Sequence, residues 1–311
     1  MTALRIGTRG SALALWQANK VSGLLNAAGV QTELVVVKTT GDRRQEVPLA
    51  EAGGKRLFVK EIEDALLEGD VDIAVHSAKD MPADLLDGLV VAAALARDDP
   101  RDAVVFPSSK PVRATPDVAA LEKLLGDTPL IGTSSVRRSA QLRAILPGAS
   151  FTPIRGNVDT RLRKLDDGGY DALVLASAGL NRLGLSSRIT AALPIEYCVP
   201  APGQGIIAVE ARAGDRDGLR TLRAMTDLRA EASLIAERAL VSALGGGCQL
   251  PLGGIALHVD GELEMRAVVA SIDGGQVLKA YGRGPVPDAD SLGRSIANEL
   301  LGKGASKILL P

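Results

Sequence analysis

Arginine side chains gather around the expected starts of three helices, which the apolar spacing predicts over residues 11–28, 134–146 and 158–167. The arginines at or beside those starts are Arg9, Arg137, Arg138, Arg155 and Arg161. A helix N-terminus carries partial positive charge, so cations are unfavourable there unless an anion lies among them. Guanidinium groups, backbone N–H groups and nearby serine hydroxyls together suit carboxylate or phosphate. The pattern predicts a site for a multiply charged anion, the alternative at any one position being exposed charge that serves solubility.

The serines that could share this site are Ser11, Ser134 and Ser135. Ser11 is also expected to cap the first of these helices, and Gly29 to end it.

The segment HSAKDMP, residues 76–82, lies at the end of an expected buried strand over residues 71–76. Open α/β sheets place ligand groups at the carboxyl ends of their strands. Asp80 is therefore a candidate for stabilising a positively charged intermediate or for moving protons, and Lys79 for an ion pair or an anion contact. The alternative for Asp80 is the N-cap of a short turn. His76 is interpreted as a strand-end residue with satisfied hydrogen bonds rather than as a catalyst.

Cys248 lies in the glycine-rich segment LGGGCQLPLGG, residues 244–254. Glycines allow a bulky group to approach the sulfur closely. No histidine lies nearby in the sequence, so a nucleophile of the cysteine-protease kind is not expected. Two interpretations stay open, a small buried apolar side chain and a permanent point of covalent attachment. Cys198, in an apolar segment, is assigned to packing.

Glycine-containing segments elsewhere fail the tests for nucleotide binding. GGKR, residues 53–56, lacks both the upstream glycine spacing and the Ser or Thr of a P-loop, and neither GTRG nor PGQG completes a dinucleotide fingerprint. Residues 45–56 are interpreted as a mobile surface loop or as a lid over a ligand cleft.

Composition excludes several classes of protein. The 36 Lys and Arg residues nearly balance 37 Asp and Glu, so a net charge of -1 gives no overall field to attract nucleic acid or anionic lipid. The two cysteines and two histidines lack the spacing of a zinc site, and the longest apolar run, residues 89–96, is too short to span a membrane. With no secretory signal at the N-terminus, we expect a cytoplasmic protein without bound metal, nucleic acid or membrane.

Strand and helix signals alternate twice in the order β-α-β-α-β, which favours two α/β lobes with mostly parallel sheets. The first set covers residues 4–8, 11–28, 32–39, 58–68 and 71–76, and the second covers 129–133, 134–146, 150–155, 158–167 and 171–177. Breaker-rich residues 96–102 and 198–205 are expected to be two hinges between the lobes, and the cleft between lobes is the expected ligand site.

The pattern changes after the second hinge and its return to the first lobe. A helix is expected over residues 227–244, strands over 254–259, 262–272 and 276–281, and a helix near 289–301. The sequence thus predicts three domains: residues 1–97 with 204–224, residues 103–198, and an α+β domain over residues 227–311.

Seven ordered motifs strengthen the prediction of function. They are TRGSALALWQ (8–17), GGKRLFVKE (53–61), HSAKDMP (76–82), IGTSSVRRSAQL (131–142), IRGNVDTRLRKL (154–165), LNRLGL (180–185) and GGGCQLPLGG (245–254). Together they closely resemble the hydroxymethylbilane synthase family, also called the porphobilinogen deaminases, from Arg5 to the last domain. Arg56 and Ile206 depart from that family's usual glycine and alanine. The resemblance implies two lobes similar to type II periplasmic binding proteins, plus a third domain.

The resemblance also implies roles for individual residues. Cys248 matches the cysteine that holds a dipyrromethane cofactor through a thioether, and Asp80 matches the aspartate that stabilises the developing azafulvenium cation. Residues that match contacts to cofactor or substrate carboxylates are Arg9, Ser11, Lys79, Ser134, Arg137, Arg138, Arg155, Arg161 and Arg182. Lys55 and Phe58 match the active-site loop and its border.

The implied reaction joins four porphobilinogen molecules into hydroxymethylbilane, in a monomeric enzyme. Each added pyrrole brings two carboxylates, which accounts for many arginines, while one acid serves the cationic intermediates. Two rivals are a non-catalytic two-lobed protein that captures a small anion and a sensor or scaffold protein. The first needs neither Cys248 nor Asp80, and no helix-turn-helix segment supports the second.

Overall fold

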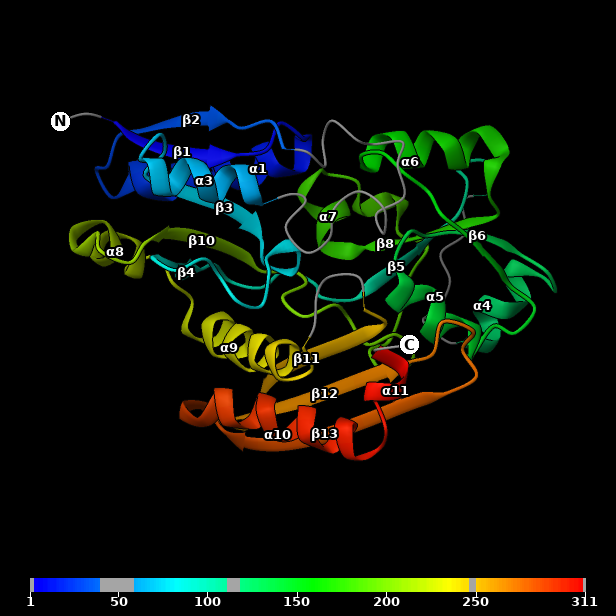
Figure 1. Cartoon of the computed structure of the whole chain (residues 1–311). Coiled ribbons are helices and arrows are strands. Elements are labelled where there is room, and N and C mark those ends of the chain that lie inside the picture. The colour runs from blue at the N-terminus through cyan, green and yellow to red at the C-terminus, as the bar shows by residue number, and fades with distance from the viewer. Residues whose placement is uncertain (1–2, 40–58, 111–117, 246–249, 310–311) are drawn as a thin grey trace.

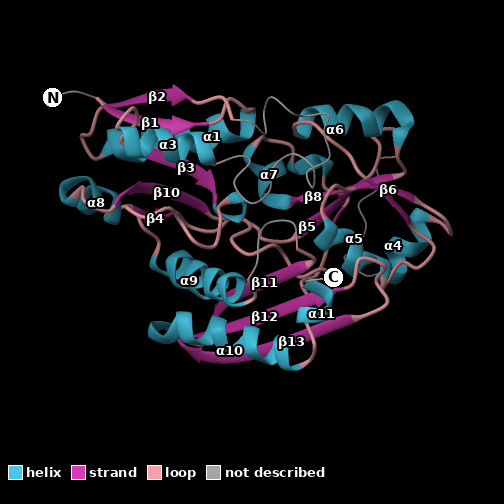
Figure 2. Ribbon diagram, in the orientation of Figure 1, coloured by secondary structure: helices cyan, strands magenta, loops and turns pink. Residues whose placement is uncertain are grey.

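The computed structural model describes residues 3–39, 59–110, 118–245 and 250–309. These residues form three sheets with helices packed against them, and Figures 1 and 2 show two α/β lobes side by side above a third unit that contains the C-terminal end. The predicted α/β class with two lobes and a separate C-terminal part is confirmed. Within the described ranges, no helix is long and apolar enough to cross a membrane.

The first lobe is a five-stranded sheet in the order β2-β1-β3-β10-β4. Its strands are β1 (Leu4–Thr8), β2 (Thr32–Val36), β3 (Ile73–Ser77), β4 (Leu89–Ala94) and β10 (Ile207–Arg212). Its helices are α1 (Ala12–Ala27), α3 (Lys60–Glu68) and α8 (Arg216–Arg223). Strands β1, β2 and β3 are parallel, whereas β10 is antiparallel to both of its neighbours.

The second lobe repeats this plan in the order β7-β6-β8-β5-β9, with β5 as the antiparallel strand. Its strands are β5 (Asp102–Val105), β6 (Leu130–Gly132), β7 (Ser150–Thr152), β8 (Ala172–Ala176) and β9 (Ala191–Ala192). Its helices are α4 (Val118–Leu125), α5 (Val136–Arg143), α6 (Val158–Lys164), α7 (Ser177–Arg182) and the short 3-10 helix η3 (Ser186–Arg188). Each lobe buries its own apolar clusters.

The third unit is an antiparallel sheet covered by helices. It consists of α9 (Leu228–Ala243), β11 (Leu252–Val259), β12 (Glu262–Ala270), β13 (Val277–Pro285), η4 (Val286–Asp288), α10 (Ala289–Gly302) and α11 (Ser306–Leu309). Helices α9 and α10 pack on each other and on the sheet around a separate apolar core. Asp227 caps α9, because its side chain accepts a hydrogen bond from the backbone N–H of Ala230 at 2.8 Å.

Several expected boundaries differ from those observed. Ser11 caps α1 as predicted, and Gly29 follows it with a φ of 83°. Helix α5 was expected from Ser134, but Ser135 is its cap and the helix begins at Val136. The helix expected to end at residue 167 stops at Lys164 and passes into a π turn, η2 (Leu165–Gly169), in which Gly168 has a φ of 85°. The strand expected over residues 32–39 ends at Val36.

Candidate active site

A cavity of about 340 Å³ lies where the two lobes and the second hinge meet. It is lined by the start of α1, the 3-10 helix η1 (Ala78–Asp80) after β3, the N-terminal regions of α5 and α6, helix α7, and residues 204–206. The structure brings nine of the predicted site residues to its wall: Arg9, Ser11, Lys79, Asp80, Ser134, Arg138, Arg155, Arg161 and Arg182. Six of these are cationic, while Asp80 and Asp159 are the carboxylates in the described lining.

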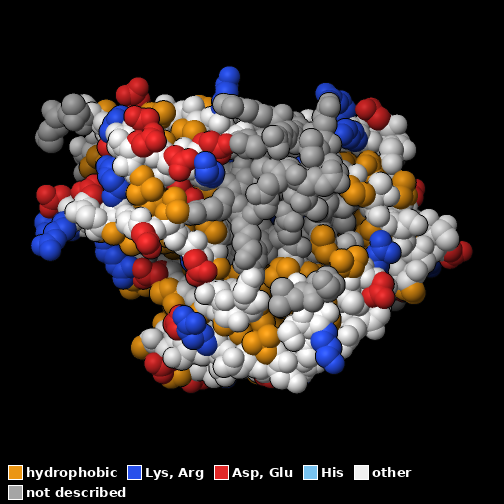
Figure 3. All heavy atoms as spheres, in the orientation of Figure 1, with side chains coloured by type: hydrophobic (Ala, Val, Ile, Leu, Met, Phe, Trp, Pro, Cys, Tyr) orange, Lys and Arg blue, Asp and Glu red, His pale blue; other side chains and the backbone are white. Residues whose placement is uncertain are grey.

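This concentration of positive charge is local. On the face seen in Figure 3, acidic and basic side chains of the described residues are interspersed without a broad patch of one sign. The cavity therefore recognises an anion at short range.

Asp80 and Lys79 lie together in η1, directly after β3 carries the chain to the cavity. The Lys79 ammonium donates to Oε1 of Gln204 at 3.2 Å. Burial, together with the charge of Arg138, lowers the pKa of Lys79 to about 8. Burial thus makes the ammonium of Lys79 less stable than it is in water, although Asp80 and Asp102 favour it.

Arg155 and Arg161 flank the start of α6. Nε of Arg161 donates to the carbonyl oxygen of Gly156 at 2.8 Å, which orients the guanidinium. Burial and the neighbouring charges of Arg138 and Arg155 lower the pKa of Arg161 to about 10. Among its described residues, the cavity wall therefore brings together six cations and two carboxylates.

Two serines of the described cavity wall, Ser11 and Ser134, hold backbone groups in place. Oγ of Ser11 accepts from the N–H of Ala14 at 3.3 Å and caps α1. Oγ of Ser134 donates to the carbonyl oxygen of Ile154 at 2.6 Å and accepts from its N–H at 3.0 Å. Ser134 thereby ties the start of α5 to the segment that leads into α6.

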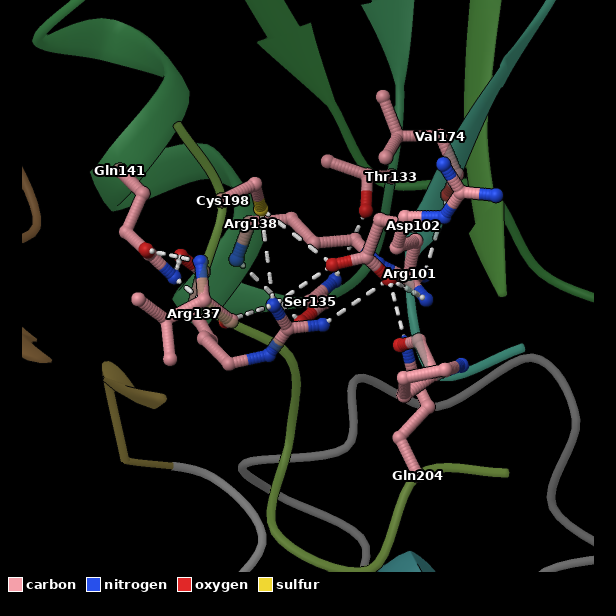
Figure 4. A network of polar contacts seen from close by, with 12 residues as sticks. Arg101, Asp102, Thr133, Ser135, Arg137, Arg138, Gln141, Val174, Cys198 and Gln204 are labelled. Atoms are coloured by element: carbon pink, nitrogen blue, oxygen red, sulfur yellow. Dashed lines mark hydrogen bonds and ion pairs between the residues drawn. The ribbon is translucent and has the colours of Figure 1, made fainter. Parts of the chain in front are cut away.

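Arg137 and Arg138 are neighbours on α5, but only Arg138 lines the cavity. Both contact Asp102, as Figure 4 shows, with ion-pair distances of 2.7 Å to each guanidinium. Arg137 also donates to the carbonyl oxygen of Val199 at 2.7 Å and borders a separate cavity of about 90 Å³. Successive helical residues point about 100° apart, so the two side chains leave α5 in different directions.

Arg182 reaches from α7 to both hinges. It donates to the carbonyl oxygen of Gly205 at 2.6 Å, lies 3.6 Å from a carboxylate oxygen of Asp98, and stacks over the ring of Trp16 at 5.9 Å. Its pKa is lowered, chiefly by burial. Arg182 therefore lines the cavity and, through these contacts, also connects the second lobe with the first lobe and the hinges.

Three predicted site residues, Cys248, Lys55 and Phe58, lie outside the described residues. The described residue nearest to Cys248 on its C-terminal side is Leu250. Leu250 borders the 90 Å³ cavity, which shares Lys79 with the larger one.

Sequence reasoning missed two polar residues of the site, Asp102 and Gln204. Both lie in segments recognised only as hinges, and the pattern of breakers there gave no sign of a ligand. Cys198, assigned to packing, is fully buried, but its Sγ also lies 3.3 Å from Asp102. His76, not proposed as a catalyst, lies 3.1 Å from the buried carboxylate of Glu210.

Known proteins resemble this chain over nearly its whole length. Residues 4–220 match the family described as "Porphobilinogen deaminase, dipyromethane cofactor binding domain", and residues 232–302 match "Porphobilinogen deaminase, C-terminal domain". A curated porphobilinogen deaminase from Syntrophobacter fumaroxidans is 46% identical over 308 residues, which cover 98% of this chain and 96% of that protein. The chain belongs to the porphobilinogen deaminase family. The predicted family, transferase activity and dipyrromethane cofactor are thereby confirmed.

Solved structures outside the porphobilinogen deaminase family show weaker likenesses. Substrate binding domain 2 of Lactococcus lactis GlnP has a TM-score of 0.43 at 9% identity, covering 72% of this chain and 87% of that one. The aliphatic sulphonate binding protein SsuA of Escherichia coli has a TM-score of 0.40 at 14% identity, covering 78% and 70%. These scores are too low to support any argument about function.

The described cavity suits the cofactor of the porphobilinogen deaminase family. A dipyrromethane with acetate and propionate groups is a polyanion, and burial is the main cause that lowers the pKa values of Lys79 and Arg161. Carboxylates of the cofactor would favour the charged forms of both side chains. Among the described residues, no group of three or more His, Cys, Asp or Glu side chains lies arranged to hold a metal ion.

Proposed function

We propose that this protein joins four porphobilinogen molecules head to tail on a dipyrromethane primer held by Cys248, and releases hydroxymethylbilane after the fourth addition. The observation that carries the proposal is a cavity whose wall combines six cations from both lobes with the carboxylate of Asp80. Each pyrrole of the growing chain carries two carboxylates, so a cavity of this charge can hold several rings by charge-assisted hydrogen bonds.

In this proposal the cavity residues divide between primer and substrate. The contacts to the primer come from Lys79, Ser134, Arg138 and Arg161, and the contacts to porphobilinogen from Arg9, Ser11, Lys55, Phe58, Arg155 and Arg182. Arg137 was expected among the primer contacts, but its bonds to Asp102 and Val199 favour an indirect role, in which it supports α5 while Arg138 faces the ligand.

Asp80 is the proposed catalytic residue. Loss of ammonia from porphobilinogen leaves an electrophilic methylene pyrrolenine that is positively charged when protonated on nitrogen, and a fixed carboxylate stabilises that charge without reorganising water. The primer, when bound, supplies a free pyrrole α-carbon as nucleophile. Helix η1 places Asp80 at the cavity, and Lys79 and the arginines orient the carboxylates so that the reacting carbons can meet.

The proposal also includes the oligomeric state, the location and the domain bounds. The family resemblance supports a monomer, the sequence composition supports the cytoplasm, and the domains comprise residues 1–97 with 204–224, residues 103–198, and residues 227–311. The return of β10 to the first sheet supports a discontinuous first domain.

Intact-protein mass spectrometry tests the attachment. Protein made in a haem-producing host should carry a covalent adduct of two linked pyrroles, and Cys248→Ser should remove it. Cys198→Ala is the matched control, because the other cysteine is buried and should not affect the adduct. An unmodified mass for the wild-type protein would contradict the proposal.

A further inference from the structure

The buried carboxylate of Asp102 gathers donors from several segments that are distant in sequence. Asp102 is the last residue of the first hinge and the first of β5, and it is fully buried. Arg137 and Arg138 approach it from α5, Gln204 from the second hinge, and Cys198 from the beginning of that hinge, as Figure 4 shows. The two guanidinium groups hold the pKa of Asp102 far below its usual value of 3.8, despite its burial.

The contacts with Asp102 also determine how many N–H groups of Arg138 can bind a ligand. Nε and one terminal nitrogen of Arg138 contact Asp102, and the other terminal nitrogen donates to the carbonyl oxygen of Val174 at 3.1 Å. A guanidinium has five N–H groups, so these three contacts fix its plane and leave two N–H groups. Because Arg138 lines the cavity, those groups are available to a bound carboxylate.

Gln204 extends this network to the first lobe. Its Nε2 donates to Asp102 at 2.9 Å and to the carbonyl oxygen of Pro100 at 2.7 Å, while its Oε1 accepts from Lys79 at 3.2 Å. The side chain is 1% exposed. Both amide hydrogens and the amide oxygen are therefore engaged. The side chain of Gln204 connects Lys79 of the first lobe with Asp102, and Asp102 orients Arg138 of the second lobe.

We propose that Gln204 is a positioning residue for the polymerisation: its side-chain amide joins Lys79 to the Asp102–Arg138 pair, so that cations from both lobes are presented to the same carboxylate-bearing ring. The inference rests on the proposed function, since it names how two of the proposed primer contacts are held relative to each other. Neither Lys79 nor Arg138 has a direct bond to the other, and Gln204 bridges them.

The contact between Gln204 and Lys79 can be tested through the pKa of Lys79, which depends on the charges around it. Asp80 in its own turn and Asp102 on β5 favour the ammonium, whereas burial and the charges of Arg137 and Arg138 on α5 disfavour it. The resulting pKa of about 8 lies close to the pH of an ordinary assay. The oxygen of Gln204 accepts a hydrogen bond from Lys79, and a change of that atom changes the pH at which the ammonium is lost.

The experiment compares the pH dependence of kcat/KM for porphobilinogen in the primer-loaded protein and two variants. The pKa of Lys79 is about 8 in the protein alone, and a carboxylate of the primer should raise it, so the wild-type activity should fall on the basic side above pH 8. Gln204→Met removes the accepting oxygen, so the basic limb should move down by about one pH unit and kcat/KM at neutral pH should fall about tenfold. Gln204→Glu places a carboxylate beside Lys79, so its basic limb should move up.

Gln141→Met is the matched control. Gln141 is also a buried glutamine that binds the second hinge, through the N–H and carbonyl oxygen of Val199, but it does not contact Lys79. It should lose stability without a shift of the basic limb. Intact mass reports primer loading and thermal unfolding reports folding in all variants, so a folded Gln204→Met protein without primer, beside loaded Gln141→Met, also supports the bridge.

Three outcomes separate the possibilities. Basic limbs that coincide in the wild type and both Gln204 variants would overturn the inference while leaving the proposed function intact. Failure of both Gln204 variants to fold, when Gln141→Met folds, would make Gln204 a structural residue and overturn it as well. A wild-type protein with neither adduct nor turnover would instead contradict the proposed function.

Discussion

Asp80 and Asp102 both lie near guanidinium groups, but the protein encloses only Asp102 among them. Asp80 lines the cavity at the end of η1, where its carboxylate can meet a ligand. Asp102 is fully buried and forms ion pairs at 2.7 Å with both Arg137 and Arg138. The two residues carry the same chemical group, so their different surroundings determine what each can do.

The comparison shows how this protein separates support from chemistry. An acid paired with two arginines orients a helix and has no further capacity to respond to a substrate. An acid left at the wall of a cationic cavity can stabilise positive charge that develops during a reaction. A substitution of Asp80 should therefore reduce turnover more than stability, and a substitution of Asp102 should reduce stability more than turnover.

The largest expected effect is a loss of turnover when the carboxylate of Asp80 is removed. Asp80→Ala in the primer-loaded protein should lower kcat by about 100- to 1000-fold, since the carboxylate acts mainly in the transition state. KM for porphobilinogen should change far less. Steady-state kinetics measure both, and turnover at the wild-type rate would remove Asp80 from its proposed role.

Asp102→Asn should show the reverse pattern. Breaking a buried pair leaves uncompensated charge, so the free energy of unfolding should fall by about 3–5 kcal/mol, measured with a chemical denaturant. The folded-state pKa of Asp102 is lowered, so its contribution is present above about pH 4 and is lost as the pH falls below its usual value of 3.8. The difference in the free energy of unfolding between wild type and variant should therefore be constant between about pH 5 and about pH 8. Asp80→Asn is the control and should destabilise little.

The arginines sharpen the same comparison at a smaller scale. Arg155→Ala should raise KM for porphobilinogen about tenfold, the effect of losing one charge-assisted hydrogen bond, with little change in stability. Arg137→Ala should destabilise the protein instead, because it leaves Asp102 and the Val199 carbonyl without a donor. Equal effects of the two substitutions on KM would place Arg137 in direct contact with a ligand.

The smallest expected effect concerns Cys198. Burial raises the pKa of its thiol to about 12, and the neighbouring carboxylate of Asp102 adds to this. At pH 8 about one thiol in ten thousand is ionised, so alkylation of native protein by iodoacetamide should be very slow. Asp102→Asn should accelerate it by loosening the network, as followed by mass spectrometry of the modified peptide. Rapid alkylation of the wild type would show that this network is open.

The sequence predicted the regular parts of the fold well. Apolar periodicity and caps located α1, the change of pattern after residue 227 indicated α9 and α10, and the repeated strand-helix order indicated two lobes. Nine residues of the cavity wall were also predicted, eight from motifs at strand ends and helix starts and Arg182 from the family resemblance. These features depend on residues close together in the chain, which is why they could be found there.

Features that depend on distant segments could not be found in this way. Nothing local to Gln204 indicates that it meets Lys79 and Asp102, because 125 and 102 positions of chain separate it from them. Arg137 and Arg138 have the same type and adjacent positions, and only the arrangement of β5 and the second hinge around α5 distinguishes them. Residues 204–224, which contain β10, were assigned to the first lobe, but the strand and its place in the sheet were not predicted, for the same reason.

That strand constrains the order in which the protein can be assembled. A ribosome that has released residues through Ala192 has supplied every strand of the second sheet, whereas the first sheet still lacks its member between β3 and β4. The lobe that begins the chain is therefore completed later than the lobe inserted into it. Until Arg212 emerges, the facing edges of β3 and β4 have no partner, and this interval is when a nascent chain most needs protection from aggregation.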